Sequence, residues 1–145
     1  MSEKYLITID GVQSYDGEED RVSLSTFGEF RRENDSFFIS YNESAATGFE
    51  GDVTSLEIES DKKVVLHRRG ISNTQLIIER GRRHLSHYIT GYGGAMVGIK
   101  ADTIDNRLHD SGGELQLLYS LDINASLMSQ NRLSITVKEL RTTDV

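Results

Sequence analysis

Residues 37–98 read FFISYNESAATGFEGDVTSLEIESDKKVVLHRRGISNTQLIIERGRRHLSHYITGYGGAMVG. Apolar and polar residues alternate through most of this stretch, which is typical of strands with one buried face. Three polar insertions interrupt the alternation: YNES at 41–44, LHRRG at 66–70 and YITGYG at 88–93. The stretch therefore predicts several half-buried strands that carry polar groups at fixed places.

The same alternation extends outward and predicts about ten strands and no long helix. Polar, acidic or glycine-containing segments between the strands are interpreted as connections. The predicted strands are Lys4–Asp10, Arg21–Arg32, Phe37–Glu43, 54–58, 64–68, 76–80, 85–89, 96–103, 115–123 and 133–137. The predicted long connections are the acidic loop Gln13–Asp20, the loop Ser44–Gly51, the loop Ile104–Gly113 and the connector Asn124–Asn131, with a frayed tail after Leu140.

Short strands joined mostly by tight turns indicate an antiparallel meander. The chain has no proline, which fits long paired strands because proline cannot donate to a sheet ladder. Ten twisted strands form a stable domain either by closing into a barrel or by splitting into two packed sheets. The predicted fold is thus an all-β, up-and-down antiparallel barrel of eight to ten strands, and a β-sandwich is the alternative.

Several motifs together resemble the YwiB-like family of bacterial β-barrels. They are Tyr41–Ser44, Arg68-x-Gly70, Tyr88 with Thr90–Gly93, Gly113-x-Leu115-x-Leu117-x-Tyr119 and Asn131-x-Leu133-x-Ile135. The likeness runs from the first strand to about Val137. It implies a calycin (lipocalin-like) barrel, and the family has no assigned activity.

Composition limits the class of protein. A chain of 145 residues is most simply one domain, 1–145, and the lack of cysteine rules out disulfides and thiolate metal sites. There is no signal-peptide pattern and no apolar run long enough to cross a bilayer, so a cytoplasmic protein without membrane contact is expected. The net charge of −7 disfavours general nucleic-acid binding.

Positive charge is concentrated in the basic hairpin, defined as residues 62–83. It holds seven Lys or Arg residues against one acid, Glu79. These side chains could bind an anionic partner, namely a nucleotide, RNA or an acidic protein, or could pair with acids of adjoining strands such as Glu57, Glu59 and Glu79. The residues considered for an anionic partner are Arg68, Arg69, Arg80, Arg82 and Arg83.

Two opposite charges are predicted on inward-facing positions. Glu43 continues the face of Phe37, Ile39 and Tyr41, while Arg68 continues that of Val64 and Leu66. Because a buried charge is costly unless it is paired, we expect Glu43 and Arg68 to meet inside the barrel or at its mouth. They would form either a structural ion pair that fixes strand register or a polar anchor for a ligand. The candidate ligand-binding residues are Tyr41, Glu43, Thr54, Arg68, Tyr88 and Tyr119.

Other chemistry is weakly supported. The histidines of His84-x-x-His87 face opposite sides of a regular strand and could not chelate one ion without a bulge, so no metal or other cofactor is expected. The glycines near residue 93 lack the Lys-Ser/Thr ending of a phosphate loop. Without an activated nucleophile or a metal set, an enzyme ranks third.

Two functions remain open from sequence. The first is binding of a small apolar or amphipathic ligand in the barrel. The second is a protein- or RNA-interaction module that uses the basic hairpin or a strand face. A homodimer is also possible.

Overall fold

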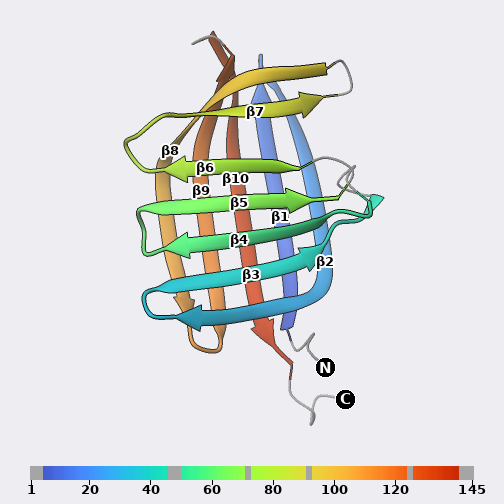
Figure 1. The fold of residues 1–145 in the computed structure, drawn as a ribbon, viewed down its shortest axis with the longest axis vertical. Coiled ribbons are helices and arrows are strands. Elements are labelled where there is room, and N and C mark those ends of the chain that lie inside the picture. The colour runs from blue at the N-terminus through green and yellow to red at the C-terminus, as the bar shows by residue number, and fades with distance from the viewer. Residues whose placement is uncertain (1–4, 46–49, 71–72, 91–92, 124–125, 141–145) are drawn as a thin grey trace.

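The computed structural model describes residues 5–45, 50–70, 73–90, 93–123 and 126–140. They form ten strands (Figure 1). The strands are β1 (Tyr5–Tyr15), β2 (Glu18–Glu33), β3 (Ser36–Asn42), β4 (Val53–Glu59), β5 (Lys63–Arg69), β6 (Thr74–Glu79), β7 (His84–Thr90), β8 (Gly93–His109), β9 (Gly112–Ile123) and β10 (Ser126–Glu139).

All ten strands belong to one antiparallel sheet with the order β6-β5-β4-β3-β2-β1-β10-β9-β8-β7. Strands that pair in the sheet are therefore consecutive in the chain, except that β1 pairs with β10. One continuous sheet that curls on itself is a nearly closed barrel, which confirms the predicted fold. The sandwich alternative does not hold, because the strands do not divide into two separate sheets.

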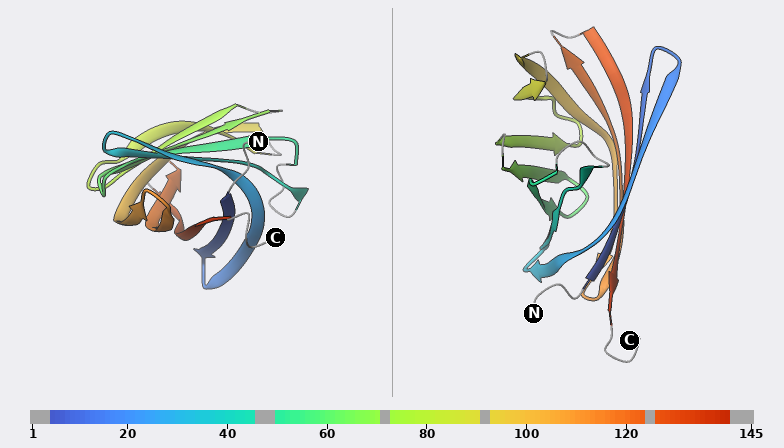
Figure 2. Two further views of the ribbon diagram at one scale, coloured as in Figure 1. Left: turned by 90° about the horizontal axis from the view of Figure 1, so that it is seen from below. Right: turned by 90° about the vertical axis from the view of Figure 1, so that its right-hand side faces the viewer.

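The barrel is flattened into two layers (Figures 1 and 2). Strands β3 to β7 form one layer and run crosswise to β1, β9 and β10 in the other. The two longest strands, β2 with 16 residues and β8 with 17, bend from one layer into the other. A register shift between Ala101 and Thr103 lies in β8. Bulges of this kind increase bending and twist, which lets a sheet turn such a corner.

Gly28 lies in β2 where close packing leaves no room for a side chain. A Cβ atom there would overlap the carbonyl oxygen of Ser40 and lie 2.5 Å from Ile7 Cδ1. The sequence predicts a bulge or a close-packing point at Gly28, and the structure shows close packing within a regular β2–β3 ladder.

The core consists of aligned rows of inward side chains that cross β2 to β6. In the first row Phe30 faces Ile39, and Ile39 faces Leu56. The row continues through Leu66 to Leu76. All five side chains are buried, and they pack with side chains of the other layer. These members of the opposite layer include Ile7, Ile99, Leu115, Leu117, Ile135 and Val137.

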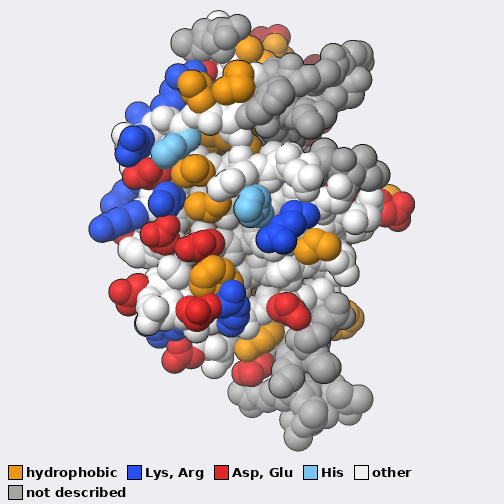
Figure 3. Space-filling view, viewed as in Figure 1, with side chains coloured by type: hydrophobic (Ala, Val, Ile, Leu, Met, Phe, Trp, Pro, Cys, Tyr) orange, Lys and Arg blue, Asp and Glu red, His pale blue; other side chains and the backbone are white. Residues whose placement is uncertain are grey.

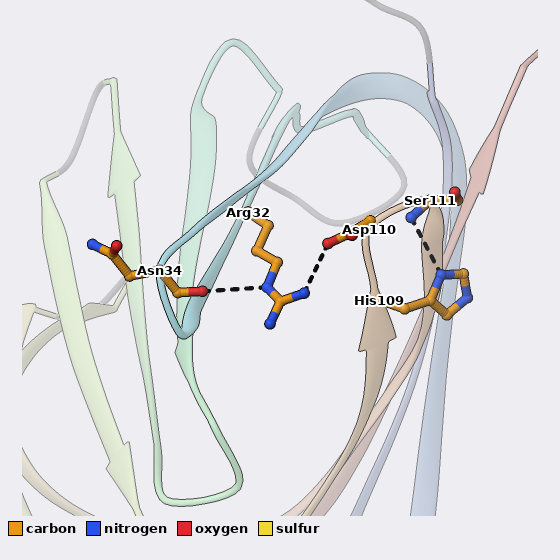
Figure 4. Close-up of polar contacts among 5 residues, drawn as sticks. All are labelled: Arg32, Asn34, His109, Asp110 and Ser111. Atoms are coloured by element: carbon orange, nitrogen blue, oxygen red, sulfur yellow. Dashed lines mark hydrogen bonds and ion pairs between the residues drawn. The ribbon is translucent and has the colours of Figure 1, made fainter.

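The lower end of the barrel is closed by two turns that contact each other (Figure 4). Arg32, at the end of β2, donates one hydrogen bond to the carbonyl oxygen of Asn34 and another to Asp110 Oδ1 at 2.8 Å. Asp110 belongs to the β8–β9 turn, in which the backbone N–H of Ser111 donates to His109 Nδ1. The Arg32–Asp110 contact thus ties the two layers together.

The seam between β6 and β7 is where the sheet does not close with a ladder. At one end, isolated bridges join Glu79 to Arg82 and Arg80 to Ala101. Farther along, the hydroxyl of Ser86 donates to the carbonyl oxygen of Gln75 at 2.6 Å. At this point a side-chain hydroxyl, and not a backbone N–H, donates the hydrogen bond between the two strands. The barrel is therefore joined at the seam by single contacts and not by a continuous ladder.

Three predicted connections are wrong. Gln13–Asp20 and Ile104–Gly113 contain mostly strand residues, with two-residue turns only at 16–17 and 110–111, and β10 already begins at Ser126. The residues at the start of β2 are exposed on both faces, so no apolar alternation marks them as strand. In β8 the inward position between Ile104 and Leu108 is occupied by the polar Asn106. This interrupts the apolar–polar alternation by which a strand is recognised in the sequence. The tail predicted to fray lies mostly outside the described residues.

Candidate functional site

A polar row crosses the inner face of the sheet beside the hydrophobic rows. Tyr41 faces Thr54, Thr54 faces Arg68 and Arg68 faces Thr74. Each comes from a different strand, from β3 to β6, and the four side chains share one face because residues directly opposite each other in a ladder point to the same side of the sheet. Glu43 follows β3 on the same face as Tyr41. The row therefore concentrates polar groups at one end of the β3–β6 layer.

Glu43 is the centre of a hydrogen-bonded network in this row. The hydroxyl of Thr54 donates to Glu43 Oε2, and Arg68 Nη2 lies 3.4 Å from the same oxygen. Arg68 Nε also donates to the Thr54 hydroxyl at 3.3 Å. The side chains of Glu43 and Arg68 are 2% and 13% exposed. The two predicted charges therefore meet inside the barrel, where paired partners offset much of the cost of burial.

The phenol of Tyr41 lies in this network. Burial raises its pKa well above the ordinary value of 10.0, and the negative charge of Glu43 raises the pKa further, while Arg68 opposes the shift. Tyr41 is therefore a neutral phenol across the physiological pH range. In that form it contributes a hydrogen-bonding hydroxyl and not a charge.

Asp52 extends the buried polar region and was not singled out from sequence. It is 3% exposed, and its carbonyl oxygen accepts a hydrogen bond from the backbone N–H of Glu43 at 2.9 Å. Gly70 has a φ of 157°, and a Cβ atom there would overlap Asp52 Oδ1. The Arg68-x-Gly70 motif thus places a cation inward and then leaves room for the Asp52 carboxylate.

A second candidate site is the outer groove, a concavity of about 780 Å³ on the opposite face of β2 to β5. Its lining side chains come mostly from outward positions of these four strands. The outward lining residues are Glu29, Arg31, Phe38, Ser40, Ser55, Glu57, Val65, His67 and Arg69. Basic, acidic and hydrophobic side chains are interspersed on the face formed by β3 to β7 (Figure 3).

The floor of the outer groove is low because Ser40 and Ser55 face each other across β3 and β4. Their hydroxyls lie 3.5 Å apart. Phe38 stands on the neighbouring outward position of β3, and the Arg31 guanidinium lies 4.1 Å from its ring centroid. Small side chains beside a large aromatic one produce the hollow, and the cation over the ring fixes one wall.

Charge in the outer groove is mixed in sign. Arg69, Glu29 and Glu57 form no ion pair or side-chain hydrogen bond within the part of the chain that the structure describes. Arg31 also contacts Glu33. The groove thus combines an available cation with two available carboxylates, and a ligand that carries only one sign of charge would meet repulsion as well as attraction.

Comparison with known proteins gives the family. A family model described as a domain of unknown function, DUF1934, matches residues 7–135. The chain belongs to the DUF1934 family. No curated protein sequence matches it. The matched range runs from β1 to β10 and therefore contains the barrel, the polar row and the outer groove.

The DUF1934 chain is also similar in structure to the ywiB protein from Bacillus subtilis. The TM-score is 0.78 at 15% sequence identity, over 94% of this chain and 92% of that one. The resemblance to YwiB-like proteins seen in the sequence motifs is confirmed. At this identity the likeness extends to the fold alone. No helix in the described part of the DUF1934 chain is both long and apolar enough to span a membrane.

The predicted site residues of the DUF1934 chain divide into three groups. The structure brings Tyr41, Glu43, Thr54 and Arg68 together, as described above. Tyr119 is on β9, faces Asn131 of β10 and packs partly buried against the hydrophobic core. Tyr88 is on β7 opposite Ala95, and its side chain lies outside the described residues.

The basic hairpin of the DUF1934 chain is largely neutralised. Four of its seven cations contact carboxylates: Lys63 with Glu59, Arg68 with Glu43, Arg80 with Asp61 and Arg83 with Asp122. The expected partner Glu59 is used, whereas Glu57 is not. Pairing of this kind leaves less positive charge for an external anion than the sequence indicates.

His84 of β7 contributes to the seam with β6. His84 Nε2 lies 2.7 Å from Glu79 Oε1. On β7, Ser86 is half-buried whereas Leu85 is 62% exposed, so Leu85 points outward despite being apolar. The side chain of His87 lies outside the described residues. Among the described residues there is no cluster of three or more groups able to hold a metal ion.

The Glu79–His84 contact has a testable pH dependence. The hydrogen bond from His84 lowers the pKa of Glu79 below its ordinary value of 4.5. A carboxyl whose pKa is lower in the folded state stabilises the fold above its unfolded pKa and loses this effect as pH falls through the folded pKa. Wild type should therefore unfold at higher urea concentration than Glu79→Gln at pH 6, and the two midpoints should converge as the pH falls through the lowered pKa of Glu79. A difference that persists at acid pH would contradict this role.

Proposed function

We propose that this DUF1934 protein is a binding protein whose amphipathic ligand lies in the outer groove. The observation that carries the proposal is the concavity of about 780 Å³, whose lining includes the apolar Phe38 and Val65 and the guanidinium of Arg69. Ligand sites usually enclose roughly 300–1,000 Å³ and combine apolar walls with a few placed polar groups. The proposed role is ligand binding, as one of the two functions predicted from the sequence, but on the outer wall and not inside the barrel.

The barrel interior supports ligand binding less well. Tyr41, Glu43, Thr54 and Arg68 line neither the outer groove nor the two smaller concavities near β1, β2 and β10. The Glu43 carboxylate already accepts from Thr54 and contacts Arg68. A ligand bound there would have to replace contacts that the protein makes for itself. The polar row is better explained as a structural pair that fixes strand register.

An RNA partner is also less well supported. Most cations of the basic hairpin are paired, and Arg68 faces the interior. In the groove, Glu29 and Glu57 would repel phosphates, which supply most of the affinity for nucleic acids. A ligand with apolar surface and charges of both signs fits the groove better.

Filling the groove tests the proposal. Ser55→Trp would place an indole over the groove floor from an outward position, without altering the core. Anilinonaphthalenesulfonate, a fluorescent amphipathic anion, should bind wild type with increased and blue-shifted emission. Its affinity should fall about tenfold or more in Ser55→Trp because the apolar contact area is occupied. Arg69→Gln should weaken binding as well.

The matched control is Thr136→Trp, on the exposed outer face of β10. It adds the same side chain outside the groove and should bind the dye as wild type does. Equal loss in both tryptophan variants, or unchanged binding in Ser55→Trp, would refute the groove as the ligand site.

A further inference from the structure

The available charges lie toward opposite sides of the outer groove. Glu29 of β2 faces Ser40, Ser40 faces Ser55, and Ser55 faces His67 of β5. Arg69 is the next outward position after His67 on β5. The path from Glu29 to Arg69 therefore crosses the sheet from β2 to β5, which is three spacings between neighbouring strands, and then advances two residues along β5.

Because of this separation, a small zwitterion cannot pair with both Glu29 and Arg69. Neighbouring strands are about 4.8 Å apart, so three intervals span about 14 Å. The ammonium and carboxylate of a free amino acid are only a few bonds apart. An extended polypeptide advances about 3.3–3.6 Å per residue, so side chains about four residues apart match the span. The ligand class that fits is therefore a polypeptide segment.

The middle of the groove is suited to bind an apolar side chain of the polypeptide segment together with the peptide groups on either side of it. Phe38 and Val65 supply apolar surface on β3 and β5, and Glu57 stands between them on β4. The hydroxyls of Ser40 and Ser55 lie on the floor, where each can donate to or accept from a peptide group. An alternation of charged, apolar and charged side chains in an extended segment complements this order.

Building on the proposed function, we infer that the occupant of the outer groove is an extended segment of a partner protein. A basic side chain of the segment pairs with Glu29, an apolar side chain contacts Phe38 and Val65, and an acidic side chain pairs with Arg69. The basic and acidic residues are about four positions apart. Charge complementarity sets the specificity, as it does in other polar interfaces.

Two peptides of equal composition test this inference. Both have acetylated and amidated ends and a fluorescent label. The first, Lys-Ser-Leu-Ser-Glu, separates its charges by four positions, and the second, Ser-Leu-Lys-Glu-Ser, places them side by side. Fluorescence anisotropy should show binding of the first about tenfold tighter than the second, because only the first can reach both ends of the groove.

A charge-swap cycle provides the structural control. Arg69→Glu and Glu29→Lys should each weaken binding of the separated-charge peptide about tenfold. The double variant should recover most of the loss, because the same peptide can then lie in the opposite direction. Recovery is not expected if the single variants act by disturbing the fold, so it distinguishes recognition from instability.

The outcomes separate the inference from the proposed function. Equal binding of the two peptides, no recovery in the double variant, or stronger binding of an oligouridine probe would overturn the inference. If the dye still binds wild type and fails in Ser55→Trp, the groove stands as a ligand site and only the polypeptide assignment falls. If neither dye nor peptide binds, both are wrong.

Discussion

Arg68→Ala is expected to lower the free energy of unfolding by about 3–5 kcal/mol. The carboxylate of Glu43, 2% exposed, would lose its cationic partner and remain buried. The hydroxyl of Thr54 would also lose a donor, the Nε of Arg68. An unpaired buried charge costs far more than the pair itself contributes, so the truncation should be among the most damaging single changes in this chain.

Urea unfolding followed by circular dichroism measures this effect. Arg69→Ala is the matched control, because the adjacent Arg69 faces outward without an ion pair in the described part of the chain, and it should change stability by less than about 0.5 kcal/mol. The double variant Glu43→Gln/Arg68→Met should be more stable than Arg68→Ala, since it removes both charges. Equal stability of Arg68→Ala and Arg69→Ala would show that the buried pair does not hold the fold.

The same variants test the interior-ligand hypothesis. Native mass spectrometry of wild type should show the mass of the chain alone if the polar row is structural. A co-purified small molecule that disappears in Glu43→Gln/Arg68→Met, while the fold is retained, would instead identify Glu43 and Arg68 as ligand anchors.

Gly28→Ala is expected to cost about 3 kcal/mol, the upper end of the usual range for overpacking. Its Cβ would lie 2.5 Å from Ile7 Cδ1 and overlap the carbonyl oxygen of Ser40. Ile7 is fully buried in the core, and Ser40 belongs to the β2–β3 ladder. Neither neighbour can move without disturbing either core packing or backbone hydrogen bonds.

Gly11→Ala is the control for this prediction. Gly11 is also a strand glycine, but a Cβ there would meet Leu133 Cδ1 at 3.9 Å, an ordinary van der Waals contact. Replacing this glycine should be neutral or stabilise by up to about 1 kcal/mol, because alanine restricts the unfolded chain. Thermal unfolding of the two variants should move in opposite directions or differ strongly. Similar melting temperatures would contradict close packing at Gly28.

The residues on the inner face of the barrel were predictable because the alternation within a single strand identifies them. The alternation Phe37, Ile39, Tyr41 places Glu43 on the buried face, and the cost of an unpaired charge then requires a partner such as Arg68. The ends of the long strands were not predictable by this means. Around residues 13–20 they extend beyond the core, where neither face selects apolar residues.

The outer groove could not be derived from alternation. Outward positions such as Ser40, Ser55 and His67 resemble any solvated strand face when each strand is considered alone. They become one surface only through the register that places Ser40 opposite Ser55 and Ser55 opposite His67. The available signal was the small outward residue Ser40 next to the outward Phe38 on β3. Its meaning depends on the register of four consecutive strands, β2 to β5.

The pairing of β1 with β10 has a consequence for how the chain folds. Eight of the ten strands pair with the strand that precedes them through short connections, but Tyr5 must find Glu139 across nearly the whole chain. Loop closure of that length carries a large entropic cost that is recovered only after the contact forms. We therefore expect hairpins at each end to form early and their docking to limit the folding rate. The two folded halves, β1 to β6 and β7 to β10, would then meet at the β1–β10 ladder and again at the β6–β7 seam.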